Sequence, residues 1–408
     1  MDSKNKENVI LVFDRMWVED QAIDTFLGDQ AINAIVLCPD EYKQRCGKVK
    51  RVIGFENYLY NENVALAAID IGREYNVTEV IGTHEFDLIR AGRVRDELGV
   101  QGQTKISATA YRDKLVMKQC IRKAELKTAC FLPLCDNTDL SHAAALLTLP
   151  IVVKPRDGAG SKAVEILRSK DDVSGWSSRN ASHLNMMIEE YLNYPMYHID
   201  GLKAGDQILG LTVSKYIGTC LDVKSGNSLG SIQLKDDSVL FQKAKDHASK
   251  TINALPGPDV MPFHLEIFVD QNENIIFSEI ASRVAGGNID QIVKLKHNID
   301  LLDVWIKYQL NKDLRDLSNV RSSKEVFGLI IFPPKMGQLQ KIPTECNHHD
   351  VIKYVVKNKV GDDFSLIRSS ADCIAYAIFK GRDEHELEST LKDINKWFYQ
   401  NLVISGAV

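Results

Sequence analysis

Residues Phe263 to Asn288 read FHLEIFVDQNENIIFSEIASRVAGGN. Apolar and polar residues alternate on both sides of the turn-forming residues 270–274, and this pattern predicts a β-hairpin. Glu266 lies in the first predicted strand and Glu279 in the second, so we expect both carboxylates side by side on one face. Two such carboxylates repel each other unless a divalent cation lies between them, and oxygen ligands of this kind suit Mg²⁺ shared with substrate phosphates. A surface hairpin with ordinary solvated charges is the alternative.

A second stretch, residues 149–167, reads LPIVVKPRDGAGSKAVEIL and contains a glycine loop. An apolar strand leads to Lys154, the loop follows with Gly158, Gly160 and Ser161, and the alternating residues after it predict a returning strand. A dinucleotide fingerprint must instead open a helix, and a P-loop needs a different glycine spacing. We therefore expect a glycine hairpin whose backbone N–H groups, with the serine hydroxyl, fold over phosphate oxygens. A plain mobile turn is the alternative.

The third stretch, residues 187–201, reads MIEEYLNYPMYHIDG. A predicted strand leads into residues 189–192, and Pro195 then marks a bend before the next strand. A short extended segment between two structural units can offer its backbone N–H and C=O groups to a planar heterocycle such as adenine, because these groups still need partners.

In their order along the chain, these elements resemble the ATP-grasp superfamily over roughly residues 107–288. The resemblance implies an α/β and α+β chain with the ATP-grasp fold. A parallel α/β domain would cover residues 1–106, the ATP-grasp domain residues 107–325, and a C-terminal β-rich subdomain residues 326–408. Within the ATP-grasp domain, a small lid subdomain would span about 115–190 and a large subdomain about 191–325. The N-terminal part agrees, because its predicted strands and helices follow in βαβα order.

The resemblance also implies roles for single residues, with ATP as the nucleotide and Mg²⁺ or Mn²⁺ as the metal ion. Glu266 and Glu279 would bind the metal ion, and Lys154 and Arg283 would be catalytic because they neutralise the transferred phosphoryl group. The residues that bind ATP would be Lys114, Lys154, Gly158, Gly160, Ser161, Glu189, Glu190 and, through its backbone, Leu192. The residues on the substrate side would be Glu85, Arg283, Gly286, Gly287 and Asn288.

Three polar side chains near these elements have competing interpretations. Glu85 ends a predicted strand and is a candidate for the acceptor pocket, and a solvated loop acid is the alternative of equal weight. His198 is expected to be a satisfied sheet residue and not a catalytic base. His264 is expected to point away from Glu266.

Two positions depart from the family pattern. Met196 stands where an acid often binds the ribose, which leaves the anchoring of the ribose open. Ala281 stands where an asparagine often follows the second metal-binding glutamate, so a metal ion would depend more on phosphate and water oxygens. The pattern E-I-A-x-R-x-x-G-G at residues 279–287 resembles the branch that contains the bacterial L-amino acid ligases, which make dipeptides.

The resemblance therefore implies an ATP-dependent carboxylate-amine ligase that forms an acyl phosphate and releases ADP and phosphate. Dipeptide synthesis from L-amino acids is the first expectation. One alternative is an ATP-grasp ligase that acts on a non-amino-acid carboxylate in a biosynthetic pathway. The other is a nucleotide-binding regulatory module without turnover, which the two departures favour and the retention of both metal-binding glutamates disfavours.

Composition sets broader limits. The 408 residues suffice for two or three domains, and 44% hydrophobic with 26% charged residues is typical of a soluble globular protein. The net charge of -5 provides no basic field for nucleic acid, so we expect small-molecule substrates and, as a further expectation, a homodimer. Eight cysteines without a C-x-x-C pair predict reduced, mostly buried thiols in a cytoplasmic protein. No signal peptide or membrane span is predicted. Cys346, His348 and His349 lack zinc-type spacing and are interpreted as structural.

Overall fold

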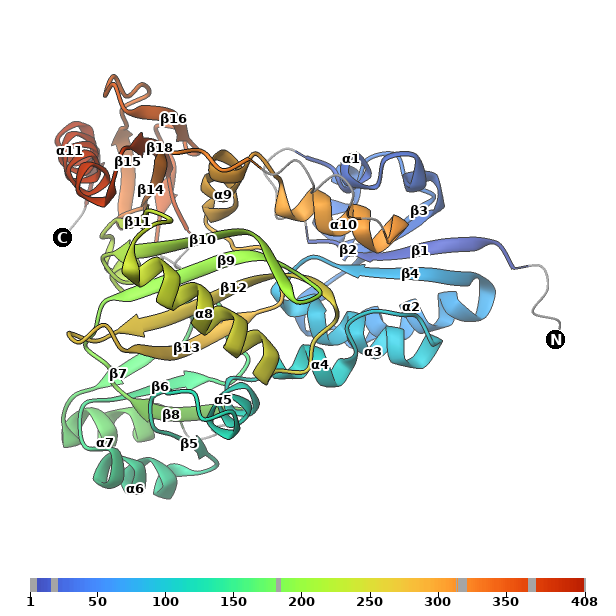
Figure 1. Ribbon diagram of the computed structural model, residues 1–408, viewed down its shortest axis with the longest axis horizontal. Helices are drawn as coiled ribbons and strands as arrows, with labels where there is room; N and C mark the ends of the chain where they lie inside the picture. Colours follow the sequence, from blue (N-terminus) through green and yellow to red (C-terminus); the bar gives the residue numbers. More distant parts are fainter. Residues whose placement is uncertain are drawn as a thin grey trace.

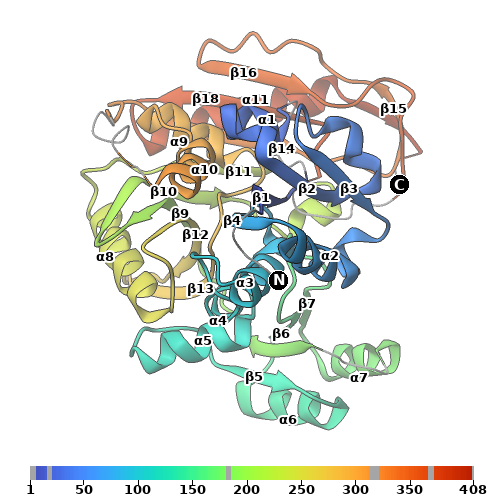
Figure 2. The ribbon, with the colours of Figure 1, turned by 90° about the vertical axis from the view of Figure 1, so that its right-hand side faces the viewer.

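The computed structural model describes residues 6–15, 21–180, 185–312, 314, 321–365 and 372–406. Three groups of elements surround the middle of the molecule, with the N-terminal sheet at the right of Figure 1, a small sheet at the bottom left and the C-terminal strands at the top left. Figure 2 shows the N-terminal sheet toward the viewer, with the small sheet below it and the C-terminal strands above.

The N-terminal part is a four-stranded parallel sheet in the order β3-β2-β1-β4. The two central strands are almost wholly buried because they are apolar apart from the exposed Asn8 at the start of β1, as strands covered on both faces must be. The parallel sheet predicted from the βαβα order is confirmed, whereas the half-exposed edge strand β3 and helix α2 were not predicted. The elements are β1 (Asn8–Phe13), α1 (Ile23–Leu27), β2 (Ala34–Pro39), β3 (Arg51–Phe55), α2 (Asn63–Glu74), β4 (Asn76–Gly82) and α3 (Leu88–Leu98).

Two helices, α4 (Lys105–Ala110) and α5 (Lys114–Lys123), lead into a small antiparallel sheet in the order β5-β8-β6-β7. Two helices cover one face of this sheet, and Leu140 and Trp176 from them fill its core. The elements are β5 (Phe131–Leu134), α6 (Asn137–Leu147), β6 (Ile151–Pro155), β7 (Glu165–Leu167), α7 (Lys170–Arg179) and β8 (Met186–Glu190).

The largest sheet has eight strands in the order β13-β12-β9-β10-β11-β14-β18-β16. Helix α8 (Val239–Ala254) lies across one face, where the alternate residues Phe263, Leu265 and Ile267 of β12 pack against it. The intervening residues of β12 therefore face the other side, toward the candidate site. The strands are β9 (Met196–Ala204), β10 (Gln207–Ile217), β11 (Leu229–Gln233), β12 (Val260–Val269), β13 (Ile275–Ala281), β14 (Val326–Phe332), β16 (Val351–Val356) and β18 (Ala375–Gly381).

Strands from the C-terminal part continue this large sheet, because β14 pairs with β11 and β18 pairs with β14. Helix α11 (Glu384–Asn401) packs on this end of the sheet. A separate three-stranded sheet contains β15 (Gly337–Lys341), β17 (Asp363–Phe364) and β19 (Val403–Ser405). Helices α9 (Ile289–His297) and α10 (Leu301–Asn311) follow β13, and α10 packs against α1 of the N-terminal part. The domain boundaries stated above remain a prediction.

Two expectations from composition concern the whole chain. The eight cysteines are free thiols, but only Cys38 and Cys46 are buried, so the prediction of mostly buried thiols is wrong. Within the described ranges, every helix is too short or too polar to cross a bilayer. The cytoplasmic location and the homodimer stay predictions.

Candidate active site

The two glutamates of the hairpin lie directly opposite each other, because the register of β12 and β13 pairs Glu266 with Glu279. The hairpin prediction is therefore confirmed, including the position of both carboxylates on one face. The Tyr216 hydroxyl donates a hydrogen bond to Glu266 Oε1 over 3.1 Å. Two carboxylates directly opposite each other on neighbouring strands repel each other, so the site favours a positive charge between them.

One such charge is Lys114, the first residue of α5. Its Nζ lies 3.2 Å from Glu279 Oε2 and donates a hydrogen bond of 2.7 Å to the Gly158 carbonyl in the glycine loop. The neighbouring Asp113 caps the N-terminus of α5 and pairs with Arg156 at the start of the same loop. Lys114 therefore connects the predicted phosphate-covering loop to the predicted metal-binding hairpin.

Glu189 forms a buried cluster with two lysines. Its carboxylate pairs with Lys154 from β6 and, through Oε2 at 3.2 Å, with Lys118 from α5. Burial alone would raise the pKa of Glu189, but the two ammonium groups outweigh burial and hold its pKa at about 2. The Glu189 side chain is thus occupied by the lysines and positions Lys154, which the resemblance places at the phosphates. Lys118 was not predicted.

We expect this cluster to make stability depend on pH. Because the pKa of Glu189 is lowered from 4.5 to about 2, its stabilising contribution is complete above about pH 4.5 and is lost as the pH falls toward 2. Glu189→Gln should lower the melting temperature most at pH 7, and the difference from wild type should shrink on acidification. Thermal unfolding followed by circular dichroism at several pH values measures this. Glu190→Gln is the matched control, and an equal pH-dependent difference in both variants would contradict the prediction.

The glycine loop between β6 and β7 has the predicted strand-loop-strand form, since Ile151 pairs antiparallel with Leu167. The dinucleotide interpretation is therefore excluded here by the structure as well. Gly160, Ser161 and Ala163 have φ values of 61°, 55° and 56°. Backbone in this left-handed region can turn successive N–H groups toward one side, as in anion-binding nests.

We expect Gly160→Val to separate a phosphate loop from a plain turn. A β-branched residue at a φ of 61° is strained by about 1–2 kcal/mol, so the loop should lose its form and turnover should fall at least about tenfold. Steady-state ADP release measures this. Gly205→Val is the matched control, because Gly205 has the same φ of 61° in the β9–β10 turn with no atom near an added Cβ. Full activity of Gly160→Val would show that the loop is only a turn.

The predicted adenine segment follows β8. The Glu190 carboxylate accepts a hydrogen bond from the Cys130 N–H over 3.2 Å, and the Glu190 N–H donates to the Cys130 carbonyl over 2.9 Å. Both groups of Glu190 thus join the segment to Cys130, the residue directly before β5. Within the described residues, the Leu192 N–H has no hydrogen-bond partner, as a group that binds adenine requires.

Glu85 is buried in the short turn after β4, and it lies between two arginines. Its carboxylate accepts from Arg112 Nη1 over 2.5 Å and from Arg283 Nε. Burial would raise the pKa of Glu85, but the two guanidinium groups outweigh burial and hold it well below its usual range. The alternative of a solvated loop acid is therefore wrong. Arg112 also donates to the Asp157 carbonyl of the glycine loop and was not predicted.

The prediction that His264 points away from Glu266 is wrong. Residues two apart in a strand share a face, and His264 Nε2 lies 3.6 Å from Glu266 Oε1. His264 Nδ1 bonds to Asp200 over 2.8 Å. Burial lowers the pKa of His264, but Asp200 and Glu266 outweigh burial and raise it to about 10. His198 is buried and bonded on both ring nitrogens, to Asp200 and Ser231, so it is a satisfied sheet residue as predicted.

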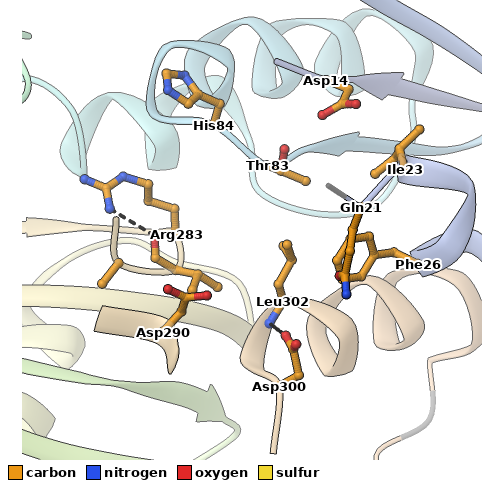
Figure 3. A pocket seen from close by; sticks show the side chains of 12 residues that line it. Asp14, Gln21, Ile23, Phe26, Thr83, His84, Arg283, Asp290, Asp300 and Leu302 are labelled. Carbon is orange, nitrogen blue, oxygen red and sulfur yellow. Dashed lines mark hydrogen bonds between the residues drawn. The ribbon is translucent and has the colours of Figure 1, made fainter. Parts of the chain in front are cut away.

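A pocket opens beside Arg283, between the N-terminal sheet and the helices after β13 (Figure 3). Its polar lining includes Arg283 and three carboxylates, Asp14, Asp290 and Asp300, which come from separate segments. Burial, and then the charge of Asp300, raise the pKa of Asp290 to about 6. Its apolar lining consists of Ile23, Phe26, Val284, Ala285 and Leu302. Residues 286–288 do not line this pocket, although Arg283 and Asp290 on either side of them do.

The residues present fit a divalent cation at the hairpin. Glu266 uses Oε1 for Tyr216 and His264, and Glu279 uses Oε2 for Lys114, so each keeps a second oxygen within the described part of the chain. Carboxylate oxygens of this kind are the ligands that Mg²⁺ prefers. The side chains of His348, His349 and Asp350, near Cys346, also lie together. They are partly exposed and lie in the C-terminal part, so they are separate from the two glutamates of the hairpin.

Residues 119–287 match the ATP-grasp domain family. An L-arginine-specific L-amino acid ligase of Bacillus subtilis is 24% identical over 334 residues, which cover 79% of this chain and 80% of that protein. A formate-dependent phosphoribosylglycinamide formyltransferase of Prochlorococcus marinus (strain MIT 9312) is 25% identical over 231 residues, with 53% and 55% covered. The crystal structure of an L-amino acid ligase from Bacillus licheniformis superimposes with a TM-score of 0.75 at 14% identity, covering 99% of this chain and 100% of that chain.

The match contains the glycine loop, Lys154 with Glu189, both hairpin glutamates and Arg283, and it begins after Lys114 and Lys118. The chain therefore carries an ATP-grasp domain and has the ATP-grasp fold. L-amino acid ligases are thus among the relatives by sequence and among the solved structures that share this fold.

Proposed function

We propose that this protein joins two L-amino acids into a dipeptide, with release of ADP and phosphate. The observation that carries the proposal is the convergence of Glu266, Glu279 and Lys114 with the glycine loop, because together they would hold phosphates and a metal ion at one place. The similarity to L-amino acid ligases along most of the chain supports the choice of substrate.

In the proposed reaction, a substrate carboxylate oxygen attacks the γ-phosphorus of ATP, and ADP leaves with the bonding electron pair. The amine of the second amino acid then attacks the acyl phosphate, loses a proton and displaces phosphate. Lys154 and Arg283 neutralise charge that spreads over the phosphoryl oxygens, and this preorganised charge is the main catalytic contribution in phosphoryl transfer. Mg²⁺ held by Glu266 and Glu279 would supply further charge neutralisation at the phosphates.

The glycine loop has a second task, which is to exclude water. An acyl phosphate hydrolyses when water reaches it, so the site must close before the first step. Arg112 and Lys114 hold the carbonyls of Asp157 and Gly158, so the loop is already tied to the rest of the site.

The pocket beside Arg283 favours an amino acid with a cationic side chain. Among the described residues of its lining, Arg283 is the only cationic side chain, and Asp14, Asp290 and Asp300 give the pocket an excess of negative charge. The apolar wall suits the methylene groups of a long side chain. L-Arginine is thus the first substrate to test, in agreement with the specificity that the name of the Bacillus subtilis relative states.

A second candidate function is a ligase for a non-amino-acid carboxylate, because the formyltransferase relatives also match, though over about half of their length. A regulatory module without turnover is the third. The ion pairs at Glu189 and Glu279 argue against it, since they hold the lysines that would surround the phosphates in the proposed reaction.

The test is to incubate the protein with ATP, Mg²⁺ and amino acids, singly and in pairs, and to separate the nucleotides by chromatography with mass detection of products. We expect ADP, phosphate and a dipeptide, formed rapidly only when both amino acids are present. AMP as the main product would contradict the acyl phosphate mechanism. ATP binding without product under any pairing would favour the regulatory module.

The pocket makes a separate prediction for Asp290. Asp290→Asn should lower kcat/KM for L-arginine about tenfold relative to L-citrulline, a neutral molecule of similar shape, because a hydrogen bond to a charged group is lost. Steady-state rates with both substrates measure the ratio. Asp303→Asn on the outer side of α10 is the control, as its carboxylate pairs with Lys307 at the surface. An unchanged ratio in Asp290→Asn would remove this carboxylate from substrate recognition.

A further inference from the structure

A line of hydrogen-bonded side chains crosses the large sheet on the face opposite α8. The register of β9 and β12 places His264 beside Asp200 and Glu266 beside His198. Asp200 is buried and bonds to both histidines, with Oδ2 at 2.5 Å from His198 Nδ1 and Oδ1 at 2.8 Å from His264 Nδ1. At the far end, His198 Nε2 lies 2.7 Å from the Ser231 hydroxyl of β11. Every member of the line thus has a partner.

Two histidines and a carboxylate could also be the ligands of a transition metal, but the distances favour hydrogen bonds. Ligand atoms at about 2.0–2.1 Å from a tetrahedral zinc ion lie about 3.3 Å from each other. Here the nitrogen and oxygen atoms are 2.5 Å and 2.8 Å apart, which are hydrogen-bond separations. The cluster is therefore a fixed hydrogen-bonded support and not a preformed metal site.

The near end of this support is Glu266. Because Asp200 engages Nδ1 of His264, the ring is held with Nε2 toward Glu266 Oε1, at 3.6 Å. The Tyr216 hydroxyl, from β10, contacts the same oxygen over 3.1 Å. On the other side of His264, the neighbour across the strands is Ala281, which has no polar group to compete for the ring. Two side chains thus fix one oxygen of Glu266 and leave the other for a ligand.

We propose that His264 is a positioning residue for the metal-binding carboxylate Glu266, and that Asp200 holds His264 in place. This inference rests on the proposed function, because it takes Glu266 as a ligand of Mg²⁺. Groups that orient a metal-binding side chain typically change metal affinity or activity 10–100-fold when they are removed. The support should therefore act on the need for Mg²⁺ and not on recognition of the amino acids.

The experiment measures the Mg²⁺ concentration that gives half-maximal ADP formation at saturating ATP and amino acids. His264→Asn and Asp200→Asn should raise this concentration at least about tenfold, with little change in KM for either amino acid. Tyr216→Phe, which removes one donor and keeps the ring, should raise it by a smaller factor. The Tyr216→Phe variant also keeps the proposal testable if the His264 variant does not fold. Calorimetric titration of ADP with and without Mg²⁺ gives a second readout that needs no turnover.

His247→Asn is the matched control, because His247 is a buried histidine of α8 on the opposite face of the same sheet. It should lower the melting temperature without changing the Mg²⁺ requirement. If His264→Asn behaves in the same way, the proposal is wrong. If ADP binding of the wild type does not depend on Mg²⁺, the proposal is also wrong.

The outcomes separate this inference from the proposed function. A protein that forms no dipeptide, but whose Mg²⁺-dependent ADP binding weakens in His264→Asn, would support the positioning role and contradict dipeptide synthesis. Elemental analysis of the purified protein supplies the last check. A stoichiometric transition metal that is lost in Asp200→Asn would replace the hydrogen-bonded support with a metal site and overturn the proposal.

Discussion

Glu279→Gln is expected to lower the rate of ADP formation about a thousandfold or more while the protein stays folded. The substitution keeps the shape of the side chain but removes the charge opposite Glu266, so a divalent cation loses a ligand. A metal ion contributes several kcal/mol to the stabilisation of a phosphoryl transition state, and each 1.36 kcal/mol is a factor of ten in rate. Single-turnover ADP formation and circular dichroism of the same sample measure the two parts of the prediction.

The control for this prediction lies in the turn of the same hairpin. Glu273 is exposed and pairs with Lys243 at the surface, so Glu273→Gln should keep nearly full activity. In Glu279→Gln, the Nζ atom of Lys114 would also lose its carboxylate partner at 3.2 Å. Equal rates for the Glu279 and Glu273 variants would remove the hairpin from the active site.

Arg283→Ala is expected to reduce ADP formation about 10²–10³-fold, the usual cost of removing one donor that stabilises a transition state. ATP affinity should change less than about threefold, because the lost contact belongs to the transition state and not to bound ATP. The fold should persist, since Glu85 keeps its hydrogen bond of 2.5 Å to Arg112. Rates at saturating substrate and a direct ATP-binding titration separate the two effects.

Two variants control for the loss of a positive charge as such. Arg283→Lys keeps the charge but not the planar fork, so it should recover part of the rate. Arg382→Ala removes an exposed arginine that pairs with Glu386 in the C-terminal part, and it should have no effect. A parallel loss of ATP binding and of rate in Arg283→Ala would mean that Arg283 binds the nucleotide only.

The hairpin and the glycine loop could be predicted because their signals are local. Alternation over a few residues determines the face of Glu266 and Glu279, and the loop is recognised by the strands on either side of it. The same rule places His264 on the face of Glu266, because the two residues are two positions apart, and not away from it as predicted.

The ion pairs could not be predicted, because their partners come from distant parts of the chain. Glu85 and Arg283 are 198 residues apart, and no periodicity links them. Lys118 appears in the sequence as one basic residue of an amphipathic helix, and only the packing of α5 beside the small sheet brings it to Glu189. The one hint for Arg112 in the sequence is its position two residues before the predicted Lys114, which begins the same helix.

The continuity of the large sheet limits how this protein can be cut or recombined. Strand β11 bonds to β14 through four successive residue pairs, from Leu229 with Ile331 to Ile232 with Gly328. A chain ending before Val326 would leave β11 as an unpaired apolar edge, which is a template for aggregation. Exchange of C-terminal segments between related ligases must therefore preserve this strand pairing, and a shortened protein that precipitates would reveal nothing about catalysis.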